Sequence, residues 1–233
     1  MRTAALVPAA GRGERLGPGT PKALRPLGGV PMLVHAVRVL AQARLVDLVV
    51  VAAPPEDVAG VRRILADHDA GAEVRVVAGG ATRQESVRRA LADLPDDIEA
   101  VLVHDAARPL VPVEVVDAVA AAVRDGAAAV VPALPVTDTV KRVDDAGAVV
   151  ETLDRVALRA AQTPQGFRRA VLEAAHAGGD PLADVTDDAG LVERTGVTVR
   201  VVPGAAEAFK VTRPLDLVLA EAVLARRRAE GVR

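Results

Sequence analysis

Short, continuously apolar runs alternate with amphipathic stretches along most of this chain. The apolar runs are rich in valine, leucine and alanine and show little polar–apolar alternation, which is typical of strands covered on both faces. They occupy residues 3–9, 46–53, 73–78, 99–105 and 127–133. Apolar residues at helical spacing predict helices at residues 31–43, 112–124 and 214–228.

This alternation predicts an α/β fold with a Rossmann-like, mostly parallel sheet and helices on both of its faces. Ligands of such sheets bind at the carboxyl ends of the strands. The polar residues that follow each strand are therefore the first candidates for function. No linker or change of composition divides the sequence, so we expect residues 1–233 to form one domain.

Residues 134–167, called the β-arm below, break this rhythm because they show no helical period and are too long for an ordinary connection. Within them, residues 140–153 predict a β-hairpin with Asp145, Ala146 and Gly147 at its turn. We expect the β-arm to project from the sheet. Its valines need burial, and a twofold partner offering the same arm is the simplest cover, which predicts a homodimer.

Composition excludes several classes of function. The 233 residues include two Phe and no Trp or Tyr, and the net charge is −2. Stacking platforms and basic stripes for nucleic acid are thus missing. The lack of Cys excludes disulfides, thiolate zinc sites and a cysteine nucleophile. No apolar run has the length of a signal-peptide core or a membrane span, so we expect a cytoplasmic protein without membrane or nucleic-acid partners.

The loop at residues 8–22, after the first predicted strand, is rich in glycine and carries Arg12, Arg15 and Lys22. It is not a dinucleotide fingerprint, since Leu16 stands where the third small residue belongs, and it has no Gly-Lys-Ser/Thr of a Walker A loop. Glycines let backbone N–H groups approach a ligand, and the basic side chains suit a nucleoside triphosphate. The structural alternative is a glycine turn with solvated arginines.

A second glycine pair, Gly79 and Gly80, follows the third predicted strand. Thr82 is a candidate N-cap for the next helix, with Glu85 at the capping-box position. Arg83 and Ser86 lie at the entry to the same helix, so this loop could form the opposite wall of a nucleotide pocket. Half of this pattern can be structural.

Asp105 ends the fourth predicted strand and is followed by small residues and Arg108. A carboxylate there can hold Mg²⁺ that bridges phosphate oxygens. The structural alternative is a cap for the helix that begins near Pro112. His104 could be a base, but we interpret it as a filler at the end of a buried strand, and the other histidines show no metal-ligand spacing.

Taken in order, the segments PAAGRGERLG, GGATRQESV, HDAARP, DTVKR, TPQGF, TDDAG and FKVTRPLDL resemble the 2-C-methyl-D-erythritol 4-phosphate cytidylyltransferase family across essentially the whole chain. The resemblance implies the fold of nucleotide-diphospho-sugar transferases and a homodimer joined by the β-arm. It also implies a reaction in which CTP and 2-C-methyl-D-erythritol 4-phosphate give the CDP-linked alcohol and pyrophosphate, with Mg²⁺.

The resemblance also implies roles for residues of this sequence. Arg15, Lys22 and Lys210 would be catalytic, and Asp105 would serve the metal. The residues around the nucleotide would be Ala9, Ala10, Gly11, Gly80, Arg83, Ser86, Asp105, Ala106 and Arg108. The residues that hold the polyol phosphate would be Thr139, Arg155 and Thr186.

Two positions depart from the pattern of the family. An acidic residue often follows the double glycine, where this chain has Ala81, and Asn often stands two residues before the late lysine, where it has Ala208. The neighbouring Glu207 is the nearest acid, and we add it to the predicted substrate contacts.

Two other functions remain open at this point. One is a transferase of the same fold that acts on ribitol 5-phosphate or on a sugar 1-phosphate. The other is a non-catalytic nucleotide-binding regulator, which would not need Lys22, Asp105 and Lys210 together. A substrate phosphate is already ionised at pH 7, so catalysis needs positioning and positive charge rather than a strong general base. The lack of a histidine or cysteine constellation agrees with this.

Overall fold

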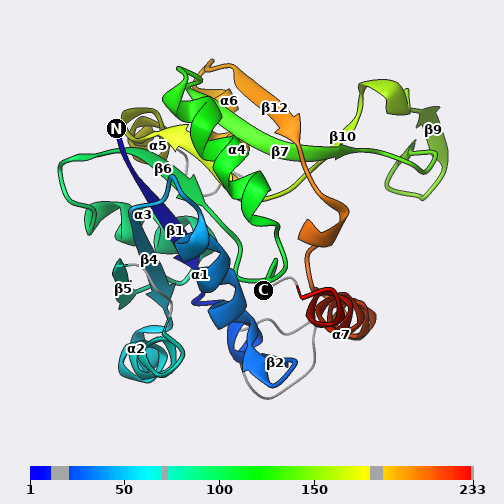
Figure 1. Cartoon of the computed structure of the whole chain (residues 1–233). Coiled ribbons are helices and arrows are strands. Elements are labelled where there is room, and N and C mark those ends of the chain that lie inside the picture. The colour runs from blue at the N-terminus through cyan, green and yellow to red at the C-terminus, as the bar shows by residue number, and fades with distance from the viewer. Residues whose placement is uncertain (12–20, 70–72, 179–185, 232–233) are drawn as a thin grey trace.

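The computed structural model describes residues 1–11, 21–69, 73–178 and 186–231. This part of the chain contains an eight-stranded sheet in the order β10-β7-β11-β6-β1-β4-β5, with β12 paired to β7 (Figure 1). The strands are β1 (Arg2–Pro8), β4 (Leu48–Ala53), β5 (Glu73–Ala78), β6 (Ile98–Val103), β7 (Ala129–Pro135), β10 (Arg159–Ala161), β11 (Gln165–Arg168) and β12 (Val199–Pro203). The predicted α/β class and all five predicted strands are confirmed.

Most neighbours in the sheet are parallel, as the continuous apolar runs predict. Strand β1 pairs in parallel with β4 and β6, β4 with β5, and β7 with β12. The exceptions are β10, which pairs antiparallel with β7, and β11, which lies antiparallel between β6 and β7. Our bounds for the β-arm were therefore too wide, because the stretches that form β10 and β11 belong to the sheet. The burial of Phe167 in the core holds β11 there.

Helices cover both faces of the sheet. One face packs against α1 (Met32–Gln42), α2 (Val58–Asp67) and α4 (Val113–Arg124), and the other against α3 (Arg83–Ala92), α5 (Arg169–Gly178) and α6 (Asp188–Arg194). Each face has its own cluster of buried Val, Leu and Ala residues. The predicted helices at 31–43 and 112–124 are confirmed as α1 and α4.

The predicted C-terminal helix is confirmed as α7 (Pro214–Ala229), which lies to one side of the sheet (Figure 1). It packs against a small hairpin made of β2 (Pro26–Leu27) and β3 (Val30–Pro31). Leu27, Val211 and Ala220 share a third apolar cluster at this junction. At the hairpin turn Gly28 has φ +58°, and its N–H donates to Glu221 at 2.8 Å. Helix α7 therefore packs against the β2–β3 hairpin from the N-terminal part of the chain and against Val211 from the C-terminal part.

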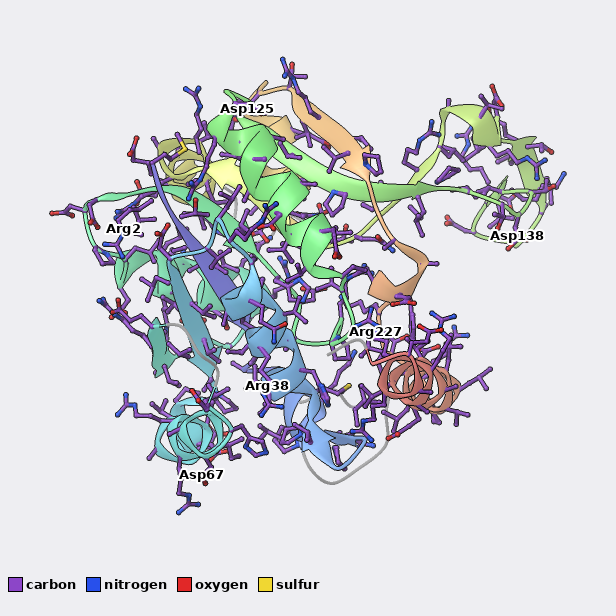
Figure 2. The ribbon with its side chains drawn as sticks, in the orientation of Figure 1. Arg2, Arg38, Asp67, Asp125, Asp138 and Arg227 are labelled. Carbon is purple, nitrogen blue, oxygen red and sulfur yellow. The ribbon has the colours of Figure 1, made fainter. Side chains whose placement is uncertain are left out.

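The β-arm leaves the sheet after β7 and returns through β10 (Figure 1). Its hairpin consists of β8 (Lys141–Val143) and β9 (Val149–Thr152), with the turn at the predicted place and φ +81° at Gly147. Figure 2 shows the side chains of this region, where Asp138 is labelled, standing apart from those of the sheet. Val143, Val149 and Val150 are each more than half exposed.

No helix within the described ranges combines the length and the apolar character needed to cross a membrane.

Candidate nucleotide site

A cavity of about 210 Å³ opens where β1, β5 and β6 end. Three loops converge on it because the carboxyl ends of parallel strands meet at one edge of a sheet. Its described lining consists of Pro8, Ala9, Ala10, Gly11, Lys22, Ala23, Gly80, Ala81, Thr82, Arg83, Ser86, Asp105, Ala106, Ala107 and Lys210. The structure thus brings together in one cavity ten of the residues predicted to be catalytic or to surround the nucleotide.

One wall of the cavity is a rigid backbone loop. Thr82 caps α3, as predicted, by accepting a hydrogen bond from the Glu85 N–H at 3.1 Å. The buried Ser86 hydroxyl donates to the Thr82 carbonyl at 2.9 Å and accepts from the Gly80 N–H at 3.0 Å. A Cβ at Gly79 would lie 2.6 Å from the Ala10 Cβ, so this position needs glycine for the two loops to touch. The wall offers backbone to a ligand rather than side-chain bulk.

The Glu85 carboxylate departs from a full capping box. It accepts a hydrogen bond from the Ala81 N–H at 2.8 Å instead of bonding the N-cap residue. Arg89 pairs with Glu85 and also donates to the Gly79 carbonyl at 2.6 Å. These two charged side chains hold the glycine pair from outside the cavity.

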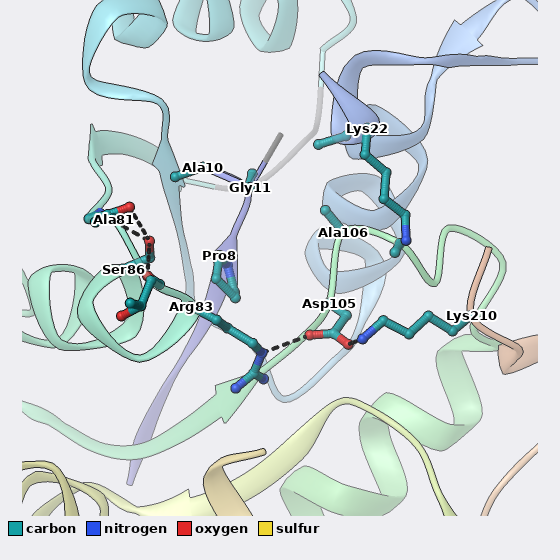
Figure 3. A pocket seen from close by; sticks show the side chains of 15 residues that line it. Pro8, Ala10, Gly11, Lys22, Ala81, Arg83, Ser86, Asp105, Ala106 and Lys210 are labelled. Atoms are coloured by element: carbon teal, nitrogen blue, oxygen red, sulfur yellow. Dashed lines mark hydrogen bonds and ion pairs between the residues drawn. The ribbon is translucent and has the colours of Figure 1, made fainter. Parts of the chain in front are cut away.

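The opposite wall carries charge (Figure 3). The Lys210 ammonium lies 2.7 Å from Asp105 Oδ2, and the Arg83 Nε lies 3.1 Å from Asp105 Oδ1. Lys22 reaches the same cavity from η2 (Lys22–Leu24), the short helical turn after the first loop. The described lining therefore carries three cations and one carboxylate, and the cavity favours an anionic ligand.

The electrostatic environment keeps Asp105 ionised. Its burial by itself would raise the pKa, but Arg83 and Lys210 together hold the pKa of Asp105 well below its ordinary value. Burial likewise disfavours the charged form of Arg83, yet Asp188 and Asp105 raise the pKa of that guanidinium above its usual range. Asp105 and Arg83 therefore both stay charged across the physiological pH range.

His104 helps to hold the backbone of Asp105 in place through the Thr163 hydroxyl. It is fully buried, and burial lowers its pKa to about 4. The Thr163 hydroxyl accepts from the Asp105 N–H at 3.0 Å and lies 3.2 Å from His104 Nδ1, while His104 Nε2 lies 3.2 Å from the Arg108 carbonyl. A neutral imidazole with its proton on Nε2 satisfies all three contacts. These contacts agree with the interpretation of His104 as a filler at the end of a buried strand. The N-cap residue of α4 is Pro112 and no side chain caps this helix, so Asp105 is not its cap.

Arg108 does not line the cavity among the described residues, contrary to our expectation. Its guanidinium donates to the Ala208 carbonyl at 2.6 Å and to the Ala161 carbonyl at 3.3 Å. The Val211 N–H also donates to the Ala107 carbonyl at 2.8 Å. Arg108 therefore holds the segment that carries Lys210, because its partly buried guanidinium forms charge-assisted hydrogen bonds with these backbone carbonyls.

The predicted polyol-phosphate contacts are not among the residues that line this cavity. Thr139 and Arg155 are exposed on the β-arm, and Thr186 is exposed just before α6. Glu207 pairs with Arg226 and Arg227 of α7, which places it in the support of that helix and away from the lining of the cavity. Arg15 lies outside the described residues.

Some residues that shape the site were missed by sequence reasoning. Gln165 donates to Asp187 Oδ2 at 2.7 Å and accepts from the Ala189 N–H at 3.0 Å, which fastens the start of α6 to β11. Asp188, the next residue of α6, then pairs with Arg83 at 2.6 Å. The segments TPQGF and TDDAG were noticed only as marks of a family, and their pairing depends on contacts between distant parts of the chain.

The protein supplies few of the oxygen ligands that a bound magnesium ion needs. No group of three or more metal-ligating side chains occurs in the described part of the chain. Asp105 is the one carboxylate among the described lining residues of the cavity. Mg²⁺ commonly keeps several waters and binds one or two carboxylates together with substrate phosphates, so a single carboxylate beside a phosphate site agrees with its chemistry.

This arrangement, with backbone groups on one wall and positive charge on the other at the ends of parallel strands, is typical of α/β proteins that bind nucleotides.

Comparison with known proteins identifies the family. The model of the 2-C-methyl-D-erythritol 4-phosphate cytidylyltransferase family matches residues 3–226. The chain belongs to this family, and the resemblance drawn from the sequence is confirmed. Proteins of that name from Streptomyces coelicolor and Frankia casuarinae are 63% and 64% identical to it, and each alignment covers 97% of this chain, with 86% and 82% of the relative.

Solved structures agree with this assignment. The crystal structure of 2-C-methyl-D-erythritol 4-phosphate cytidylyltransferase from Thermus thermophilus is 40% identical, with a TM-score of 0.75, and covers 97% of this chain and 100% of that one. The structure of 4-diphosphocytidyl-2C-methyl-D-erythritol synthase from Anaerococcus prevotii is 29% identical, with a TM-score of 0.83, covering 97% of this chain and 99% of the other.

Proposed function

We propose that this protein transfers a cytidylyl group from CTP to 2-C-methyl-D-erythritol 4-phosphate, giving 4-diphosphocytidyl-2-C-methyl-D-erythritol and pyrophosphate. One observation carries the proposal: a single cavity joins the backbone wall at Gly80 and Ser86 to the charged wall of Lys22, Lys210 and Arg83. The first wall suits a base and ribose, and the second suits phosphates. Family membership supplies the identity of the two substrates.

The chain's own groups can account for the chemical step. A phosphate oxygen of the acceptor attacks the α-phosphorus of CTP, a new P–O bond forms, and the bond to the β-phosphate breaks so that pyrophosphate leaves with the electron pair. No proton has to be removed from the attacking oxygen, since that phosphate is ionised at pH 7. Charge that develops on the transferred phosphate would be stabilised by the Lys22 and Lys210 ammonium groups. Arg15 is proposed to grip the triphosphate.

Asp105 is the residue proposed to hold Mg²⁺. When bound, the ion would neutralise phosphate charge and fix the orientation of the phosphates. Lys210 and Arg83 keep the Asp105 carboxylate ionised, which is the form that a metal requires. Ala9, Ala10, Gly11 and Ala106 would contact the nucleotide through backbone groups.

We also propose that the enzyme works as a homodimer whose β-arms complete the polyol-phosphate sites. The arm carries Thr139 and Arg155 on an exposed surface, and its valines have no cover within the described chain. Helix α7 adds an exposed apolar stripe that includes Leu215 and Val218. Apolar side chains of this number favour burial against a second copy. Thr186 remains a proposed substrate contact. Glu207 is no longer proposed as one, because it pairs with Arg226 and Arg227 of α7. A cytoplasmic location remains a prediction.

The proposal is tested by a product assay. Purified protein is offered CTP, ATP, GTP or UTP with either 2-C-methyl-D-erythritol 4-phosphate or ribitol 5-phosphate, and nucleotide-linked product and pyrophosphate are measured. A pocket that hydrogen-bonds one base edge can reject others by about 10⁴-fold, so CTP with the methylerythritol substrate should be strongly preferred. Faster turnover of ribitol 5-phosphate would favour the alditol enzyme, and CTP binding without any turnover would favour a regulator.

A further inference from the structure

A line of buried charge extends from the cavity into the protein. The Nε of Arg83 donates a hydrogen bond to Asp105 Oδ1 at 3.1 Å, and its Nη1 donates to Asp188 Oδ2 at 2.6 Å. The other oxygen of Asp188 lies 3.0 Å from His176 Nε2. Asp188 is fully buried and the side chain of His176 is nearly so. Burial of the Asp188 carboxylate carries a considerable desolvation penalty, so its charged partner Arg83 is needed to offset that penalty.

The geometry at Arg83 is unusual for an arginine beside a carboxylate. A guanidinium usually pairs with a carboxylate through two parallel N–H groups, which would occupy both oxygens of Asp105. Here Asp188 binds Nη1, and the guanidinium is oriented so that its Nε donates to Asp105 Oδ1. Asp105 Oδ2 is thereby left for Lys210, at 2.7 Å.

The position of Asp188 is itself well determined. It follows Asp187, whose side chain caps α6 by accepting from the Gly190 N–H at 2.9 Å. Gln165 of β11 bonds both Asp187 and the Ala189 N–H. Because β11 pairs directly with β6, the strand that leads into Asp105, the two carboxylates that share Arg83 are tied to neighbouring strands.

We infer that Asp188 is a positioning residue of the active site: its bond to Nη1 fixes the orientation of the Arg83 guanidinium, so that Nε meets Asp105 Oδ1 and Oδ2 is left to Lys210. The inference rests on the proposed function for its effect on turnover, but its structural content concerns only the free protein. Removal of the Asp188 charge should let Arg83 turn toward Asp105 and displace Lys210.

The three lysines of the chain, Lys22, Lys141 and Lys210, allow a direct test. Protein labelled with ¹³C at the lysine ε-carbon gives one NMR signal for each, and Asp105→Ala supplies the reference for a Lys210 without its carboxylate. Asp188→Asn keeps the shape of the side chain and removes its charge. The Lys210 signal should move toward the Asp105→Ala position, while the Lys141 signal stays unchanged.

A matched control comes from Asp117 of α4, another buried carboxylate that pairs with an arginine, Arg44, at 3.0 Å. Asp117→Asn should leave the Lys210 signal in place. In turnover, Asp188→Asn should lower kcat/KM by about 10- to 100-fold, the range seen when a group that orients an active-site ligand is lost. A Lys210 signal that stays at its original position in Asp188→Asn would overturn the inference whether or not the proposed reaction is correct.

A double variant separates positioning from support of the fold. Arg83→Met combined with Asp188→Asn removes both charges, so it leaves no unpaired buried ion and is expected to fold even where Asp188→Asn alone does not. If Asp188 acts through Arg83, the Lys210 signal of the double variant should lie at its original position. A signal at the Asp105→Ala position in the double variant would show that Asp188 does not act through Arg83 and would overturn the inference.

Discussion

Replacement of Lys210 by methionine separates catalysis from folding at this site. The Lys210 side chain is 40% exposed and makes its ion pair with Asp105 at 2.7 Å. Methionine retains most of the length and apolar stem of the lysine but has no charge. After the change Asp105 still pairs with Arg83, so no buried carboxylate is left alone.

The two expected effects differ in size. An ion pair with a partly exposed lysine contributes about 1 kcal/mol or less to the free energy of unfolding, so Lys210→Met should change the melting temperature little. The same ammonium is proposed to stabilise charge that develops in the transition state, and loss of one such donor typically lowers kcat by roughly 10²- to 10³-fold, or about 3–4 kcal/mol. The activity should therefore fall far more than stability.

The assay follows pyrophosphate release from CTP and 2-C-methyl-D-erythritol 4-phosphate, alongside thermal unfolding of the same samples. Lys141→Met is the control, because Lys141 lies exposed on the β-arm and bonds Thr152 at 2.6 Å. It should keep the turnover of the unchanged protein. Near-normal turnover of Lys210→Met would refute the catalytic role, and a large loss of melting temperature would show that Lys210 is structural.

Three further measurements address the dimer, the charge of Asp105 and the packing of α7 against the β2–β3 hairpin. Mixing inactive Arg155→Ala and Lys22→Ala under subunit exchange should restore up to about a quarter of normal activity if Arg155 acts in the partner's site, since half the dimers are mixed and each has one intact site; no recovery would place Arg155 in its own site. The pKa of Asp105 is held below its ordinary value, so its carboxylate stabilises the fold at pH values above the unfolded pKa of about 4. The melting temperature of Asp105→Asn should therefore lie below that of the unchanged protein by a constant amount near neutral pH, and this difference should shrink as the pH falls below about 4. A difference independent of pH would contradict the depressed pKa. Gly28→Ala should lower the free energy of unfolding by roughly 1–3 kcal/mol, because the residue has φ +58° and its Cβ would lie 2.5 Å from Leu224 Cδ2. An unchanged midpoint of urea denaturation would show that α7 can shift to make room for the added methyl group at no cost in stability.

The sequence by itself determined the layers of this protein and the edge of the sheet where its cavity lies. Runs such as residues 46–53 are apolar at nearly every position, and only a strand covered on both faces buries such a run completely. Since consecutive parallel strands end at the same edge, Gly80 and Asp105 could be placed near one another from their positions after strands. Local rules also sufficed for the Thr82 cap and the hairpin turn at Gly147.

Only the tertiary structure decided which partner each charged side chain takes. Arg108 and Glu207 stand in the sequence beside predicted site residues, yet one binds the Ala208 carbonyl and the other binds α7. The partners of Arg83 come from residues 105 and 188, which the chain separates widely. A long cationic side chain can reach many acceptors, and the choice depends on which carboxylate or carbonyl the packed helices and strands bring within about 3 Å. Periodicity and local motifs carry no information on such distances, so the sequence predicted the place of the site and the fold decided how its charges pair.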